Sequence, residues 1–242
     1  MISLFGWLWW CVIPVRKTLA IENFRAAFPD EPASSLRRSI GEIAWGYCEL
    51  FMGRRAVVHG AELVQGGGIC LAGHFGAWDL ALISAGEKVP ATIFVRTPEN
   101  GLAAWWITRE RERAGLELLP PSGSALSAYR ALRAGRLVVF VQDQRHNQGV
   151  SVPFFGRPAW TSRGFGVLGV HSQAPLFGAW QWRDSSGKHH IEIERLRVDL
   201  PDDPAEAENA LTLLSQQYYE RKIQERPHSW LWLHDRWRPL KQ

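Results

Sequence analysis

From about residue 54 onward, the chain alternates between short apolar runs and longer amphipathic stretches. Five apolar runs have the length and residue types of strands, namely residues 56–60, 68–73, 91–96, 136–143 and 175–182. Helical periodicity fills several of the gaps, at residues 77–85, 102–114, 124–134 and 163–171. An alternating run at 189–198 predicts an outer strand, and residues 206–224 predict a late helix. This order predicts an α/β fold in which helices flank a layered, largely parallel sheet.

The first 53 residues follow a different pattern. Residues 17–30 have a helical periodicity that is stopped by Pro29. Apolar residues recur every three or four positions over 33–53, which predicts a second helix. We therefore expect two parts, a helical segment over residues 1–53 and an α/β domain over residues 54–242.

The extreme N-terminus is apolar for about fifteen residues, includes three tryptophans, and is followed by Arg16 and Lys17. A helix that spans a bilayer needs about 20 apolar residues. No basic residue precedes the run and no small-residue cleavage site follows it, so it does not have the pattern of a secretory signal. We interpret it as an interfacial anchor that contacts a membrane surface. The alternative is a terminal helix buried against the domain.

Composition narrows the range of partners. Hydrophobic residues make up 46% of the 242 residues, which excludes a disordered chain. The net charge of +4 is compatible with a membrane surface, a phosphorylated substrate or nucleic acid. The arginines are dispersed and no nucleic-acid-binding motif is present, so we expect no nucleic acid. The three cysteines lack metal-ligand or disulfide-framework spacing, so we expect no metal and a reducing compartment.

Polar residues follow three of the predicted strands at the point where each strand ends. They are His74, Arg96 and Asp143. In open α/β sheets, active sites lie beyond the carboxyl ends of the strands. Although these residues are far apart in sequence, the fold predicts that they share one edge of the sheet.

The segment LAGHFGAWDLAL places His74 and Asp79 in apolar surroundings, with Gly73 and Gly76 beside them. Across a strand-to-helix turn, the two side chains can fold back to meet. If Asp79 accepts a hydrogen bond from one ring nitrogen of His74, the other nitrogen becomes a base. The chain has no G-x-S-x-G elbow, so this base would act on a hydroxyl of a substrate. The alternative is a core histidine with a capping aspartate.

Several segments of the chain resemble those of a known family. GHFGAWDL resembles the H-x-x-x-x-D/E motif of glycerolipid acyltransferases, and the whole is most similar to the lipid A biosynthesis acyltransferases, the late secondary acyltransferases. Further segments match that family in order: IENFRAAFPD, VRTPENGLAAWWITRERERAG, VVFVQDQ, VPFFGRPAWTSRG and RPHSWLWLHDRW. The resemblance covers roughly residues 16–238. It departs from the family at the N-terminal apolar segment, which is shorter here than in most members.

The resemblance implies roles for matching positions. His74 would be the general base and Asp79 its orienting partner. Arg96 and Arg111 would bind the phosphate or sugar-phosphate region of the acceptor, or stabilise the transition state. For Arg111 the alternative is a solvated position on a charged helix, since it lies in the sequence RERER.

Four more positions are implied to bind substrate. Asp143 would lie at the rim of the site and contact substrate or hold Arg96, and Gln144 follows it in the matching segment. Phe154 and Phe155, with Gly156, would shape the acyl channel or a lip that faces the membrane. The alternative for the two phenylalanines is core packing.

The function implied is transfer of a fatty acyl chain from an acyl thioester to a hydroxyl of a lipid A precursor. Acyl-carrier protein is the expected donor, with coenzyme A as the alternative, and no cofactor is expected. The expected location is the cytoplasmic face of the bacterial inner membrane, peripheral or monotopic. Two alternatives stay open: an acceptor that is another membrane glycolipid or a lysophospholipid, and a non-catalytic lipid-binding protein of the same fold.

Overall fold

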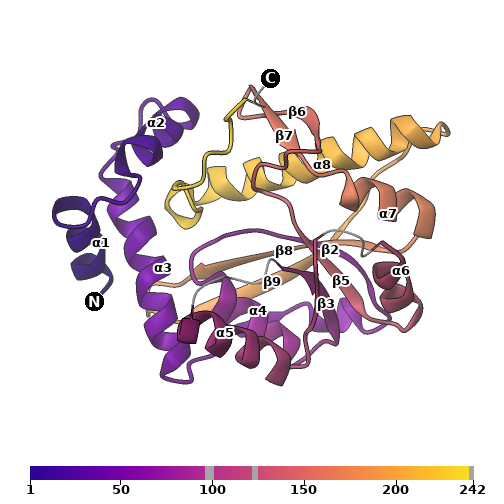
Figure 1. Cartoon of the computed structure of the whole chain (residues 1–242), viewed down its shortest axis with the longest axis horizontal. Helices are drawn as coiled ribbons and strands as arrows, with labels where there is room; N and C mark the ends of the chain where they lie inside the picture. Colours follow the sequence, from indigo (N-terminus) through magenta and orange to yellow (C-terminus); the bar gives the residue numbers. More distant parts are fainter. Residues whose placement is uncertain (96–100, 122–124, 240–242) are drawn as a thin grey trace.

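The fold is a layered α/β sandwich built on one large sheet (Figure 1). The structure is a computed structural model that describes residues 1–95, 101–121 and 125–239. Within these residues, seven strands have the order β1-β9-β8-β2-β5-β3-β4. Their bounds are β1 (Val57–His59), β2 (Gly68–Ala72), β3 (Ala91–Phe94), β4 (Glu117–Leu119), β5 (Leu137–Val141), β8 (Leu176–Arg183) and β9 (His189–Leu196). The strands from β8 to β4 are mutually parallel, as the sequence predicts.

The other edge of the sheet runs in the opposite direction. Strand β9 pairs antiparallel with β8, and the short β1 pairs parallel with β9. The run predicted as an outer strand is therefore β9, one position in from the edge, because β1 covers it.

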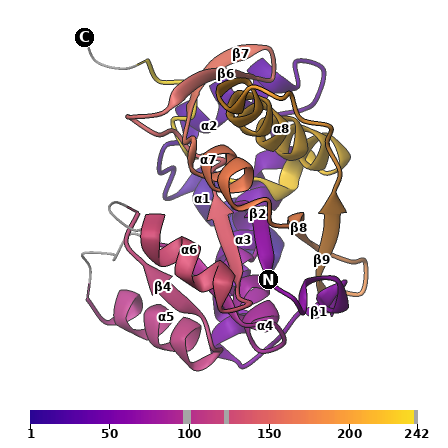
Figure 2. The same cartoon turned by 90° about the vertical axis from the view of Figure 1, so that its right-hand side faces the viewer.

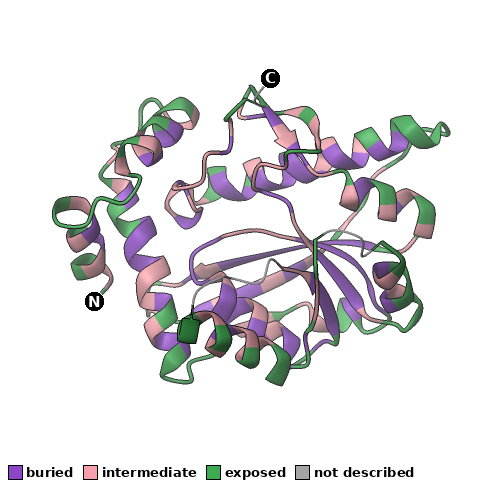
Figure 3. Ribbon diagram, viewed as in Figure 1, coloured by how far each residue is buried: buried purple, intermediate pink, exposed green. Residues whose placement is uncertain are grey.

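Helices cover both faces of the sheet (Figures 1 and 2). Helices α4 (Trp78–Gly86) and α5 (Gly101–Arg113) lie on one side. The opposite side carries α6 (Ala125–Arg133), α7 (Gly164–Ser172) and α8 (Pro204–Glu225). Figure 3 shows the result, a buried sheet between helices whose outer surfaces are exposed.

Strand β2 shows why the central strands read as continuous apolar runs. Ile69 and Leu71 pack into the cluster that includes residues of α7 and α8, whereas Cys70 packs into the cluster that includes α4. Successive side chains of a strand point to opposite faces, so a strand covered on both sides needs apolar residues at every position. All three side chains are at most 1% exposed.

The front of the chain forms α1 (Ile2–Cys11), α2 (Lys17–Ala27) and α3 (Ser35–Phe51). Helix α1 packs closely on α3, since a Cβ added at Gly6 would lie 2.1 Å from the carbonyl oxygen of Arg37. Its outer side leaves Leu4 and Trp7 each 49% exposed. The segment thus docks on the protein and also presents apolar side chains to its surroundings. Among the described residues, no helix is both long and apolar enough to cross a bilayer.

The end of the chain returns to these front helices. The side chain of Asn23 donates to the carbonyls of Trp232 and His234, and the Ser39 hydroxyl donates to the carbonyl of Trp230. The 3₁₀ helix η2 (Pro227–Ser229) opens this closing segment. The division of the chain at residue 53 stays a prediction.

A hairpin occupies the region that resembled a family loop. It consists of β6 (Val150–Phe154) and β7 (Arg157–Thr161), which form a separate two-stranded sheet. Its two-residue turn, Phe155–Gly156, has positive φ at both positions, 49° and 68°. This is the pattern of the tight turns that match the twist of paired strands. The periodicity of the sequence did not predict this hairpin, β4, or the 3₁₀ helix η1 (Ala61–Val64).

Candidate active site

The centre of the site is a buried histidine–carboxylate pair formed by His74 and Asp143. Strands β2 and β5 are parallel neighbours, and Ala72 is level with Val141. Two residues further along each strand direction, His74 and Asp143 are also level. The imidazole Nδ1 lies 2.9 Å from Oδ1 of Asp143, and the backbone N–H of His74 donates to Oδ2 at 2.9 Å. The same carboxylate therefore holds both the ring and the backbone of His74.

The two members of the pair differ in their access to solvent. Asp143 is fully buried, whereas 22% of the His74 side chain is exposed. With Nδ1 donating to the carboxylate, Nε2 is the nitrogen left to accept a proton. The Gln144 side-chain nitrogen lies 3.3 Å from this Nε2.

The pair is electrostatically coupled. Burial lowers the pKa of His74, but the charge and hydrogen bond of Asp143, together with the charge of Asp79, raise it, so the net pKa lies above the ordinary value of 6.5. Burial raises the pKa of Asp143. The charge of His74 and the hydrogen bonds that the carboxylate accepts outweigh burial and lower this pKa to about 2, so the carboxyl stays ionised. A neutral imidazole beside a permanent carboxylate is a stronger base than a free one.

Asp79 does not orient His74. Its carboxylate accepts from Arg111 Nε at 2.9 Å and Nη2 at 2.5 Å, and its other oxygen accepts from the Tyr47 hydroxyl at 2.9 Å. The expectation that Asp79 fixes the tautomer is therefore wrong, because the first turn of α4 directs this side chain toward α3 and α5. Asp143, which was expected at the rim of the site, is instead the carboxylate that bonds the His74 ring.

Asp79 and Arg111 nevertheless lie close enough to affect His74. The negative charge of Asp79 raises the pKa of His74, and the positive charge of Arg111 lowers it. Arg111 has only 13% of its side chain exposed, so it is not a solvated surface residue. Burial, then the Asp79 carboxylate, raise the pKa of Tyr47, which keeps its hydroxyl protonated as a donor.

An apolar cavity of about 60 Å³ begins beside this pair. At the end near His74 it is lined by Gly73 and Trp78, and the Trp78 ring stands edge-on to the imidazole with centroids 5.1 Å apart. From there it follows β2 and β5 beneath α4 as far as Leu137 and Leu116. Aliphatic side chains of the sheet and of α4 make up most of the lining.

Comparison with known families decides what this arrangement belongs to. Residues 54–239 match the model of the bacterial lipid A biosynthesis acyltransferases. The chain belongs to this family. The match contains His74, Asp79, Arg111 and Asp143. Family membership establishes the protein as a lipid acyltransferase.

Other comparisons add little. No protein of curated function matches the chain. Among solved structures, the chain is similar to the 1-acyl-sn-glycerophosphate acyltransferase PlsC from Thermotoga maritima, with 15% identity over 93% of this chain and 95% of that one and a TM-score of 0.44. Family membership rests on the match to the lipid A acyltransferases.

Two further residues with expected roles lie elsewhere in the acyltransferase. Phe154 is fully buried, and its ring packs against those of Trp230 and Trp237. Phe155 packs against Phe28 and Trp232. The expectation that the two phenylalanines shape an acyl channel or a lip that faces the membrane stays a prediction. Core packing describes Phe154, and neither phenylalanine lines the cavity beneath α4. The reason is topological, because their hairpin lies on the α8 side of the sheet.

Arg96 lies outside the described residues, so its expected contact with the acceptor stays a prediction. Among the residues that the structure describes, no group of three or more histidine, cysteine or acidic side chains could hold a metal.

Sequence reasoning did not identify two residues that touch the centre. Tyr47 bonds Asp79 from α3, and the indole nitrogen of Trp230 donates to Asp143 Oδ2 at 2.8 Å. Neither residue follows a strand, so the rule that selected His74 and Asp143 could not find them. The resemblance of the closing segment to the family was a signal for Trp230, but it assigned that residue no role.

Proposed function

We propose that this acyltransferase moves a fatty acyl chain from the thioester of acyl-carrier protein to a hydroxyl of a lipid A precursor. The observation that carries the proposal is the pair formed by His74 and Asp143, in a member of this family, where the His74 ring contacts Trp78 of the apolar cavity lining. The pair supplies a proton acceptor, and the cavity supplies surroundings that suit a hydrocarbon chain.

In the reaction we propose, His74 Nε2 accepts the proton of the acceptor hydroxyl while the oxygen attacks the thioester carbonyl. The C–S bond then breaks, and the thiolate of the carrier leaves and takes up the proton from His74. Asp143 keeps its negative charge throughout and stabilises the imidazolium that forms between the two steps. The Gln144 amide stands near Nε2 in the absence of substrate, so the incoming hydroxyl would replace it there.

Asp79 has a supporting role in this scheme. It fixes the guanidinium of Arg111 through two donors, and the Tyr47 hydroxyl completes its coordination. We propose that Arg111, held in this way, provides positive charge for the thioester oxygen in the transition state or for a phosphate of the acceptor. Arg96 would add to the acceptor site.

The cavity beneath α4 would receive the acyl chain. An apolar cavity of about 150 Å³ takes up a molecule the size of benzene. The present volume of about 60 Å³ is too small for a fatty chain, so its lining has to part on binding. Substitution of Ala81 by leucine fills the cavity and is expected to shift the preference toward shorter acyl donors. Ala131, an equally buried helix residue on the other face, is the matched control as Ala131→Leu.

We further propose that the N-terminal helices contact the cytoplasmic face of the bacterial inner membrane. Exposed apolar side chains of this segment include Leu4, Trp7 and Ile13. Arg16 and Lys17 follow them and suit anionic headgroups. This arrangement would deliver a lipid acceptor to the protein without a spanning helix.

The test is an acyl-transfer assay with purified full-length protein, detergent-dispersed acceptors and defined acyl thioesters, followed by mass spectrometry. The expected result is transfer from acyl-carrier protein to a lipid A precursor. Preference for coenzyme A donors would correct the donor, and preference for a lysophospholipid or another glycolipid would correct the acceptor. Tight lipid binding without turnover of any thioester would overturn the proposal in favour of a lipid-binding protein.

A further inference from the structure

Asp143 is held by a third group that the family match does not explain. Besides the backbone and ring of His74, the carboxylate accepts the indole N–H of Trp230 on Oδ2 at 2.8 Å. The indole comes from the closing segment of the chain, 87 positions away from Asp143. A donor to a buried carboxylate fixes its orientation and also reduces its basicity.

Packing and hydrogen bonds hold Trp230 in one position. Its side chain is fully buried, and its ring packs edge-on against Phe154 and Trp232. The Ser39 hydroxyl donates to its carbonyl at 2.8 Å. An isolated bridge pairs Trp230 with Phe75, the residue after His74.

The same short segment also holds the turn that carries the histidine. The backbone N–H of Leu231 donates to the carbonyl of His74 at 3.1 Å, and the N–H of Gly76 donates to the carbonyl of Ser229 at 2.6 Å. Residues 229–231 therefore hydrogen-bond to the backbone of the turn that carries His74, while the Trp230 indole hydrogen-bonds to Asp143, the partner of His74. Such support from outside the reacting groups preserves their geometry.

We propose that Trp230 is a positioning residue of the acyltransferase, which orients Asp143 and sets the basicity of His74 through it. Trp230 does not touch substrate in this role. The inference rests on the proposed function, in which His74 is the general base. Loss of the indole donor leaves Asp143 with greater negative charge density facing the imidazole, so protonated His74 becomes more stable.

Other charged groups surround the pair of His74 and Asp143, and their charges also act on it. Asp79 and Arg111 act on His74, but they are paired with each other. Near Asp143, burial lowers the pKa of His234 to about 4 and that of Arg236 to about 10, and burial raises that of Tyr219. His234 and Arg236 therefore keep one charge state between about pH 5 and pH 9 and Tyr219 stays protonated, which leaves His74 as the titrating group of this cluster.

The experiment compares Trp230→Phe with the matched control Trp232→Phe. Both indoles are fully buried in one aromatic cluster, but Trp232 donates to the Pro227 carbonyl and not to a carboxylate. For Trp230→Phe we expect kcat to fall about tenfold with little change in KM. We also expect the acid limb of the pH–kcat/KM profile to move to higher pH. Trp232→Phe should leave that limb at its wild-type position.

A second measurement does not depend on whether the variant folds. In the wild-type protein with isotope-labelled indoles, the N–H resonance of Trp230, assigned through its contacts to the Phe154 ring, should shift with the same midpoint as the His74 ring proton. An unmoved resonance, or an equal shift of the acid limb in both variants, would overturn the proposal. Failure of the proposed function is separate, because it appears as absence of transfer by the wild-type protein.

Discussion

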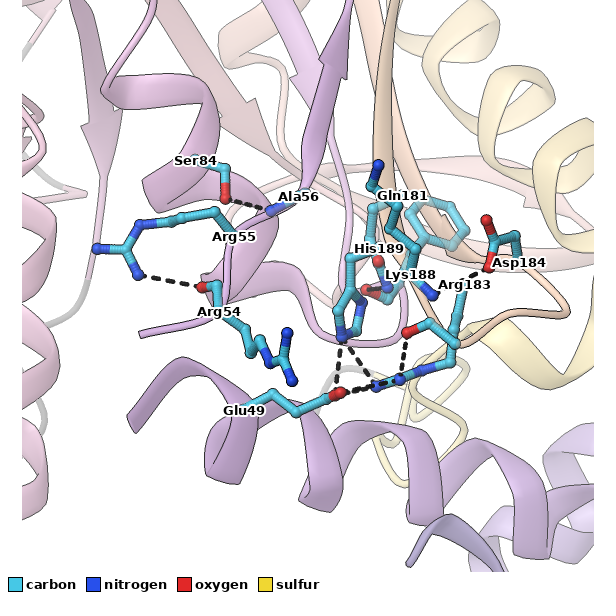
Figure 4. Close-up of polar contacts among 12 residues, drawn as sticks. Glu49, Arg54, Arg55, Ala56, Ser84, Gln181, Arg183, Asp184, Lys188 and His189 are labelled. Atoms are coloured by element: carbon cyan, nitrogen blue, oxygen red, sulfur yellow. Dashed lines mark hydrogen bonds and ion pairs between the residues drawn. The ribbon is translucent and has the colours of Figure 1, made fainter. Parts of the chain in front are cut away.

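His74 and His189 each lie 2.9 Å from a buried carboxylate, and their surroundings give them opposite properties. His74 bonds Asp143 at the end of the central strands. His189, on β9, bonds Glu49 of α3 beneath the other edge of the sheet (Figure 4). The side chain of His74 is 22% exposed, whereas that of His189 is 4% exposed.

The second pair includes a permanent cation. Arg183 contacts both oxygens of Glu49, and its Nη2 lies 2.8 Å from His189 Nε2 (Figure 4). Burial and the charge of Arg183 lower the pKa of His189. Glu49 raises it, but the net pKa lies below the ordinary value. Within the described residues no guanidinium bonds the carboxylate beside His74, and the pKa of His74 is raised.

The difference teaches that a histidine–carboxylate distance is a poor marker of catalysis. The pair with Arg183 joins α3 to the β8–β9 hairpin, and its charges are already balanced. The pair with Asp143 has a partly exposed histidine side chain and a carboxylate that, among the described residues, is not bonded to a cation other than the histidine. Access and charge balance, rather than proximity, separate a base from a structural contact.

The largest expected effect comes from replacing each histidine by glutamine. His74→Gln removes the general base, and general-base catalysis contributes about 10²- to 10⁴-fold. We therefore expect kcat to fall by that order with the denaturation midpoint near wild type. His189→Gln should retain kcat and lower the midpoint. Rate assays and urea titrations of both variants check this, and near-normal transfer by folded His74→Gln contradicts the mechanism.

The next effect separates the two carboxylates of the site. Asp143→Asn removes the charge that raises the pKa of His74 and lets the imidazole adopt the wrong tautomer, so we expect kcat to fall about 100-fold or more. Any residual acid limb of kcat/KM should move to lower pH. Asp79→Asn should weaken the hold on Arg111 and leave the limb closer to wild type. A pH–rate series on the two variants checks this, and a larger shift with Asp79→Asn would restore Asp79 as the orienting residue.

The structural pair is expected to affect stability rather than rate. Glu49→Gln leaves Arg183 buried without its carboxylate, and breaking a buried ion pair in this way costs about 3–5 kcal/mol. We expect the free energy of unfolding to fall by that order, with kcat retained at a temperature where the variant is folded. Glu110→Gln, which breaks a more exposed pair with Arg113, is the control and should cost less than about 1 kcal/mol. Equal costs would show that the buried cluster contributes no more than a surface pair.

The smallest effect is the pH dependence of stability, where the two histidines have opposite signs. The pKa of His189 is lower in the fold than in the unfolded chain. Below pH 6.5 the unfolded chain therefore binds a proton at His189 more readily than the folded state does, and this residue lowers stability as the pH falls. His74 keeps its proton in the fold, so it adds stability below pH 6.5 that is lost as the pH rises through its raised pKa. Compared with wild type, His189→Gln should lose less stability between about pH 7 and pH 5, and His74→Gln should lose more. Unfolding titrations at the two pH values measure the difference.

The sheet and the position of its active edge could be predicted from the sequence because they depend on local pattern. The apolar runs identified β2, β3, β5 and β8, and the rule of strand ends placed His74 and Asp143 together. The hairpin of β6 and β7 was missed because its turn requires positive φ at Phe155, which the residue type does not indicate.

The partner of His74 could not be found from spacing alone. Asp79 is five positions from His74 in sequence, but the side chains of a turn and of the helix that follows it point according to the packing of that helix. Here α3 and α5 supply Tyr47 and Arg111 as competing partners. The true partner lies 69 positions away, and only the pairing of β2 with β5 brings it within reach.

The closing segment has a consequence for how the protein matures. Its bonds to Ser39 and Asn23 join positions 191 and 209 residues apart, and contacts of such separation form late and slowly in folding. A chain that is still being synthesised can build most of the sheet while Asp143 lacks the indole donor. On the proposed roles, we expect a nascent or C-terminally clipped copy to transfer acyl chains more slowly than the full chain.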